Sequence, residues 1–171
     1  MKNFKTIFIA AALVFGSFVF AQAQESKIAH INTQELIEAM PGYTSAMSEL
    51  EKLQNTYSTS IEDMMKEATS LSEKYQAEAT MKTDEENANR ARELEQTQGK
   101  IIEYRQNAAR DLQKKEAELL KPVFEKARAA IKKVANEKGF DYVMDSTQGS
   151  GLIVADGYNL MPDVKKELGI Q

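Results

Sequence analysis

The sequence of 171 residues has no cysteine and a single histidine, His30. Without cysteine the chain can form no disulfide bond, no thiolate metal site and no cysteine nucleophile. With one histidine it also lacks the usual components of zinc clusters and histidine-based triads. A catalytic base needs a partner that positions it, and none is evident for His30, which we interpret as structural. We therefore expect no enzyme activity, no cofactor and no metal.

Clusters of basic residues are also lacking. The formal net charge is −4 at pH 7, and acidic and basic residues are interspersed through the middle of the chain. Nucleic acids are bound by basic patches, so this charge pattern gives no support for a nucleic-acid partner. Interspersed charges of both signs are typical of a solvated helix surface instead.

Residues 1–23 are typical of a cleaved secretory signal peptide. Lys2 and Lys5 form a positively charged n-region, and Ile7 to Phe20 is a mostly apolar run. Ala21-Gln22-Ala23 is an A-x-A cleavage site. The apolar run falls short of the ~20 residues that span a bilayer, so an uncleaved anchor is the weaker alternative. No cysteine follows the cleavage site, so we expect no lipid anchor either. Cleavage would remove two lysines and take the net charge from −4 to −6.

Proline and glycine are sparse from Tyr43 to Pro122, where no glycine precedes Gly99. Apolar or small residues recur in the first half of this stretch, and just before it, at steps of three and four. They are Leu36, Met40, Tyr43, Met47, Leu50, Tyr57, Ile61, Met64, Ala68, Leu71 and Tyr75, and only Gln54 breaks the run. Such steps average 3.5 residues, which is the heptad signature of a coiled coil. The stretch therefore predicts a long antiparallel helical hairpin.

Turn and cap residues predict where the hairpin begins and where it reverses. Pro41-Gly42 interrupts the helical pattern, so we expect a bend there before the long first arm. The chain should reverse near Thr80 to Asp84. Thr83 is a plausible helix cap, and Glu86 three residues later completes a capping box.

The returning arm carries a weaker apolar stripe. Its members are Ala88, Ala91, Leu94, Ile101, Ala108, Leu112 and Leu119, with Gln98, Arg105 and Lys115 on the same stripe. Burying apolar surface stabilises a fold by about 25 cal/mol per Å², and alanine buries little of it. The tip half of the hairpin should therefore be its least stable and most mobile part.

Beyond the returning stripe the apolar face becomes wide. It comprises Leu119, Leu120, Val123, Phe124, Ala127, Ala130, Ile131 and Val134. This face predicts that the helix continues through Pro122 with a kink, and Gly139 is a suitable end for it.

The two ends of the chain predict short strands. Residues 27–32, 140–145 and 152–155 read as strands, and we expect the last two to pair as a hairpin. Asn32 or Thr33 can cap a short helix after the first strand, and Pro162 suits the first turn of another that ends near Leu168. The strands can meet at the base of the helical hairpin, where their unpaired edges favour oligomerisation.

These residues resemble the Skp/OmpH family of periplasmic chaperones. The resemblance covers essentially the whole mature chain and rests on Leu119 to Val123, Ala135 to Asp145, Ile153 to Asp156 and Val164 to Leu168. It implies a homotrimer whose strands build a central body and whose hairpins surround a cavity. The cavity would hold unfolded outer-membrane proteins in the periplasm without ATP. The best-known members are strongly basic and this chain is acidic, so lipopolysaccharide binding is not carried over.

The candidate functional residues fall into two groups. For diffuse client binding they are Tyr57, Met64, Met65, Tyr75, Met81 and Tyr104, because methionine and tyrosine adapt to many apolar partners. The alternative is that those on the stripe simply form the hairpin seam. For oligomerisation the candidates are Ile28, Ile31, Phe140, Tyr142, Val143, Leu152, Ile153 and Val154.

The sequence thus predicts an α+β protein with a long antiparallel helical hairpin on a small β-stranded trimerisation body. The expected division is a signal peptide at 1–23, a body at 24–43 and 121–171, and an arm at 44–120. The expected function is that of a periplasmic holdase chaperone for unfolded outer-membrane proteins. Peripheral membrane contact stays open, without an anchor. The alternative is a periplasmic coiled-coil structural or adaptor protein with one folded partner.

Overall fold

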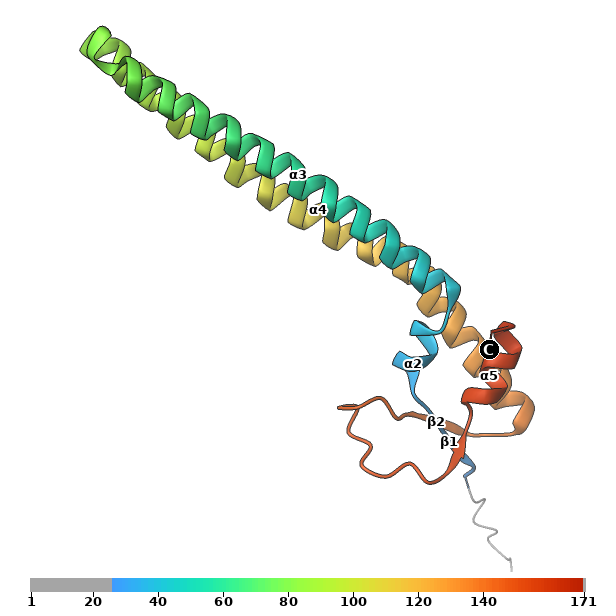
Figure 1. Cartoon of the computed structure of the whole chain (residues 1–171). Coiled ribbons are helices and arrows are strands. Elements are labelled where there is room, and N and C mark those ends of the chain that lie inside the picture. The colour runs from blue at the N-terminus through green and yellow to red at the C-terminus, as the bar shows by residue number, and fades with distance from the viewer. Residues whose placement is uncertain (1–25, 171) are drawn as a thin grey trace, which may run out of the picture.

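The computed structural model describes residues 26–170 and has a long helical hairpin projecting from a small body (Figure 1). The elements in chain order are β1 (Ile28–Ile31), α2 (Thr33–Glu38), α3 (Pro41–Glu78), the 3-10 turn η2 (Ala79–Met81), α4 (Asp84–Lys138), β2 (Tyr142–Asp145), β3 (Tyr158–Asn159) and α5 (Met161–Leu168). The predicted fold class, α+β with a long antiparallel helical hairpin, is confirmed. The predicted signal peptide lies outside the described residues.

Helix α3 begins at Pro41, so Pro41-Gly42, which the sequence predicted as a bend before the arm, form the first turn of the arm's helix. Asn32 caps the preceding helix α2, its side chain accepting a 3.0 Å hydrogen bond from the backbone N–H of Glu35. Proline suits the start of α3 because the first N–H groups of a helix have no intrahelical partner. A Cβ added at Gly42 would lie 3.3 Å from Cγ2 of Val123. The missing side chain therefore lets the two helices approach closely at the root of the hairpin.

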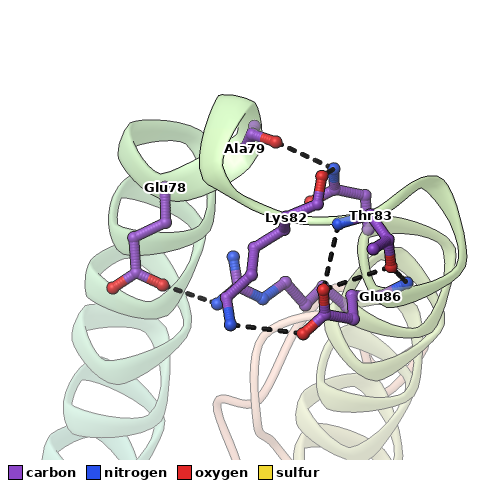
Figure 2. Close-up of polar contacts among 7 residues, drawn as sticks. Glu78, Ala79, Lys82, Thr83 and Glu86 are labelled. Atoms are coloured by element: carbon purple, nitrogen blue, oxygen red, sulfur yellow. Dashed lines mark hydrogen bonds and ion pairs between the residues drawn. The ribbon is translucent and has the colours of Figure 1, made fainter.

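The hairpin reverses through η2, and the predicted capping box opens α4 (Figure 2). The backbone N–H of Glu86 donates to Oγ1 of Thr83 over 3.2 Å, and the backbone N–H of Thr83 donates to Oε2 of Glu86 over 2.9 Å. The backbone N–H of Lys82 bonds to the carbonyl of Ala79 over 3.4 Å. The backbone hydrogen bond from Thr83, followed by that from the Lys82 side chain, lowers the pKa of Glu86.

The seam of α3 differs from the predicted stripe near the root. Ala46 is buried while Met47 is 42% exposed, so the seam passes one residue before the predicted position. Leu53 is half-buried and Gln54 is exposed, so the seam is not broken there. One residue rotates a helical position by about 100°, so counting apolar residues alone can select the neighbouring flank.

The seam of α4 differs more. Ala88, Ala91, Gln98 and Arg105, all predicted on the stripe, are exposed. Leu94, Ile101 and Ala108 lie in the seam as predicted, and the other positions that face α3 are Asn87, Arg90, Thr97 and Tyr104, so that the seam keeps alternating steps of three and four. The distal seam is therefore partly polar, as expected, but different residues make it so. Polar side chains can fill seam positions when a partner is available across the hairpin.

At the root, α4 continues through Pro122 and ends at Gly139, whose φ of 72° is left-handed. Beyond Pro122, α4 packs with β1, α2 and α5 to form the hydrophobic core of the body. The core comprises Ala29, Ile31, Leu36, Met40, Val123, Ala127, Ala130, Val134, Ala135, Leu160, Met161 and Val164. Phe124, predicted on the wide apolar face, is exposed instead. Proline lacks a backbone N–H, so α4 continues through Pro122 with one intrahelical hydrogen bond fewer.

The sheet has the strand order β2-β1-β3, and both pairings are parallel. The predicted strand at 152–155 is wrong, as is its hairpin with 140–145. That segment is irregular, Ile153 is 96% exposed, and the third strand is β3. The physical reason is topological, because a tight turn joins only antiparallel neighbours. Here the chain must cross from one edge of β1 to the other, and residues 152–155 belong to that crossing.

Replacing Thr83 with alanine should loosen the first turn of α4, because its free N–H groups lose their side-chain partner. A cap contributes about 1 kcal/mol, so amide hydrogen exchange in residues 84–87 should rise about fivefold. Exchange at residues 123–134 should stay unchanged. The matched control is Thr80→Ala, at an exposed threonine of the same turn. Equal acceleration in both variants would contradict the capping role of Thr83.

Candidate functional site

The tyrosines predicted for client binding lie in the seam of the hairpin. The hydroxyl of Tyr57 donates to Oδ2 of Asp111 over 2.7 Å, and its ring meets that of Tyr104 edge-on with centroids 6.0 Å apart. Both tyrosines are half-buried. Their apolar surface is therefore largely used within the chain, and this favours the alternative that they form the seam.

Tyr75 belongs to a polar cluster near the tip. Its hydroxyl donates to Oε2 of Glu93 over 2.6 Å, and the guanidinium of Arg90 lies 4.5 Å above its ring. Nη2 of Arg90 also pairs with Oε2 of Glu78 at 2.5 Å. The pairs 57/111, 75/93 and 78/90 are all centred on residue 84, so α3 and α4 keep one antiparallel register from the middle of the arm to its tip.

The predicted methionines differ from one another in exposure. Met64 is half-buried, whereas Met65 is 46% exposed and Met81, at the tip, is 73% exposed. Nη2 of Arg105 lies 2.7 Å from Sδ of Met65, across the hairpin. Sequence reasoning missed Ile102, which is 56% exposed. Its neighbour Ile101 had been assigned to the seam, and adjacent residues lie about 100° apart on a helix, so Ile102 falls on the flank beside the seam.

Two neighbouring grooves run along the distal half of the arm. One, of about 360 Å³, is lined by Ala68, Thr69, Ser72, Glu73 and Gln76 of α3 and by Leu94 and Gln98 of α4. The other, of about 490 Å³, is lined by Glu62, Met65, Lys66, Thr69, Ser70 and Glu73. They share Thr69 and Glu73 as lining residues, and we call the two grooves together the recess. Its walls mix apolar, uncharged polar and charged side chains.

The residues predicted for oligomerisation are divided between the surface and the core. Ile28, Tyr142, Ile153 and Val154 are exposed, and Leu152 is half-buried. Ile31 is buried in the core of the single chain, and Phe140 and Val143 pack against that core. Sequence reasoning missed Met144 and Tyr158, which are also exposed on the strands. Several large apolar side chains thus remain uncovered on the body.

Two further features of the described residues are the arrangement of their possible metal ligands and the surroundings of His30. No three acidic, histidine or cysteine side chains within residues 26–170 are grouped so that they could hold a metal ion. Nδ1 of His30 lies 3.2 Å from Oγ of Ser146, a contact that joins β1 to the segment after β2. In the same residues no helix is long and apolar enough to cross a membrane.

The geometry defines a protein that presents a long helical arm with scattered apolar side chains, on a body with uncovered strands. A family model described as outer membrane protein (OmpH-like) matches residues 27–168, and the chain belongs to this OmpH-like family. The Chaperone protein Skp of Vibrio cholerae is 24% identical over 149 residues, which cover 86% of this chain and 88% of that protein. The resemblance drawn from the sequence is confirmed. At the level of the family, the matches support a chaperone and not an enzyme.

Raising the pH should weaken the hairpin through its tyrosines. The hydrogen bonds donated to Asp111 and Glu93 raise the pKa values of Tyr57 and Tyr75 above the ordinary 10.0. A raised pKa means that this stabilisation is complete below pH 10 and is lost as the pH rises through the folded-state values. The free energy of unfolding should therefore fall above pH 10 more steeply in the natural chain than in the Tyr57→Phe/Tyr75→Phe variant.

The measurement is urea unfolding followed by circular dichroism between pH 8 and pH 11. Lysines also titrate in this range, so only the difference between the two proteins is informative. Parallel pH curves for the two proteins would contradict a role for these hydroxyl groups.

Proposed function

We propose that this protein is a periplasmic holdase chaperone, which binds unfolded outer-membrane proteins without ATP and prevents their aggregation. The observation that carries the proposal is the arm itself. It pairs a helix of 38 residues with one of 55 residues and exposes Met47, Met65, Met81 and Ile102 on a largely polar surface. A long surface with separated apolar side chains suits a partner that has no fixed shape, because many weak contacts can form in different combinations.

A holdase acts by mass action. A protein that binds the unfolded state of a client lowers the concentration of free unfolded chains, and aggregation slows accordingly. This activity needs no nucleotide and no catalytic group. The membership in the OmpH-like family and the similarity to a chaperone support the assignment.

Assembly is a necessary part of the proposal, since one arm cannot enclose a cavity. We propose a homotrimer in which residues 24–43 and 121–171 form the body and residues 44–120 form the arm. The exposed Ile28 and Tyr142 on the strands, and Ile153 and Val154 in the connection to β3, support this, because exposed apolar patches are usually covered in an assembly. A stable monomer at micromolar concentration in light scattering would contradict the trimer.

Export to the periplasm is proposed from the sequence of residues 1–23, which suits cleavage after Ala23. The competing function is a coiled-coil spacer or adaptor. A spacer would need a stiff arm and would retain one folded partner, whereas a holdase would retain many unfolded ones. The loose distal half that the sequence predicts fits the holdase better.

The direct test dilutes a urea-unfolded β-barrel membrane protein into buffer with and without this chain. Light scattering should show suppressed aggregation once the chaperone reaches one trimer per client. The suppression should be independent of ATP. Unchanged aggregation at that ratio would contradict the holdase function. The control is a folded water-soluble protein added in the same amount as the client. It should not bind the chaperone.

A further inference from the structure

One flank of the arm differs from the other in chemistry. On this flank Met65 of α3 contacts Arg105 of α4, with 2.7 Å between Nη2 and Sδ. Ile102 precedes Arg105 by three residues, and Gln98 precedes Ile102 by four, so all three share one face of α4. Gln98 lines the same groove as Thr69, and Thr69 lines the groove of Met65. These residues thus form one connected surface, which we call the Met65 flank.

The opposite flank is charged. Two residues rotate a helix position by about 200°, so Glu67 lies across α3 from Met65 and Lys100 lies across α4 from Ile102. The opposite flank also carries four more charged residues, which are all exposed: Asp63, Lys74, Glu93 and Glu103. Among residues 57–105, the large apolar side chains exposed to solvent are Met65, Ile102 and Met81 at the tip. The opposite flank therefore offers none.

We propose that the Met65 flank is the surface with which the arm binds its client, and that it takes extended segments in which apolar and polar residues alternate. This inference rests on the proposed holdase function and specifies its binding surface. The charged flank stays in solvent.

The cost of removing charged side chains from water indicates which kind of client segment binds the Met65 flank. Covering the charged flank would remove Glu67, Lys100 and their neighbours from water, which is costly unless each charge finds a partner. The walls of the recess on the Met65 flank carry the uncharged polar residues Thr69, Ser72 and Gln98 beside apolar ones, and they also include the charged Glu62, Lys66 and Glu73. The flank is therefore of mixed polarity, and it differs from the opposite one in exposing Met65 and Ile102. Transmembrane β-strands alternate apolar with polar residues, so a client strand can place apolar side chains on Met65 and Ile102 and polar ones on the recess.

Methionine at the centre of this surface suits changing clients. Its thioether is flexible and polarizable, so it adapts to side chains of different shape. The guanidinium of Arg105 beside it can donate hydrogen bonds to the backbone carbonyls that an extended segment presents. The proposal also fixes the orientation of the arms, because the Met65 flank must face the cavity of the assembly.

The test compares two variants that receive the same new residue. Met65→Gln/Ile102→Gln removes the apolar groups of the Met65 flank, and Glu67→Gln/Lys100→Gln removes charges from the opposite flank. All four positions are exposed, so both variants should keep the helicity and mass of the assembled natural protein. The Kd for a urea-unfolded β-barrel membrane protein should rise about tenfold in the first variant and stay within about twofold in the second.

A second measurement does not depend on affinity. Because the chain has no cysteine, one cysteine carrying a photo-cross-linker can be placed at position 65, 67, 100 or 102 of the full chain. Client cross-links should form from positions 65 and 102 and be several-fold weaker from 67 and 100.

The outcomes separate this inference from the proposed function. A natural protein that binds no unfolded client would overturn both. Client binding with equal affinity loss in both variants, or equal cross-linking from both flanks, would overturn the flank assignment alone. Cross-links from 65 and 102 to a second copy of the chain without client would show that this flank joins arms, and would also overturn it.

Discussion

The antiparallel seam between α3 and α4 is the contact on which the rest of the structure depends. An isolated helix of this length would leave its apolar stripe in water, and pairing covers that stripe along the whole arm. The seam changes in kind along its course. It is apolar at the root, where Val123 packs against Gly42, and becomes polar towards the tip, where Arg90 joins Glu78. The tip is thus held by specific polar contacts where apolar burial is small.

The seam also determines which side chains remain for binding. Tyr57, Tyr75 and Tyr104 are taken into it and use their hydroxyl groups or rings on partners of the same chain. Met65 and Ile102 lie immediately beside it and are left uncovered. A functional surface of this kind requires no pocket and no strained residue. It arises because the heptad pattern positions one flank next to the seam with two large apolar side chains exposed on it.

The body depends on the hairpin for its core. The two ends of the chain are brought together by the root of α4, and β1 lies between β2 and β3 with parallel pairing on both sides. Two of these strands have four residues and one has two, so the sheet is small. The core of the single chain packs on one face of it. The exposed Ile28 and Tyr142 on the other face explain why assembly and function are coupled in our proposal.

The sequence by itself determined the local features. Pro41, the Thr83 capping box, Gly139 and the strands at 28–31 and 142–145 follow from preferences that act within a few residues. The heptad pattern also placed Ile101 and most of the α3 stripe in the seam, but the tertiary structure decided the seam near the root, where a shift of one residue exchanges Ala46 for Met47. It also decided the third strand. A strand exists only with a partner, and β1 accepted Tyr158–Asn159 on its free edge and left 152–155 in the connection.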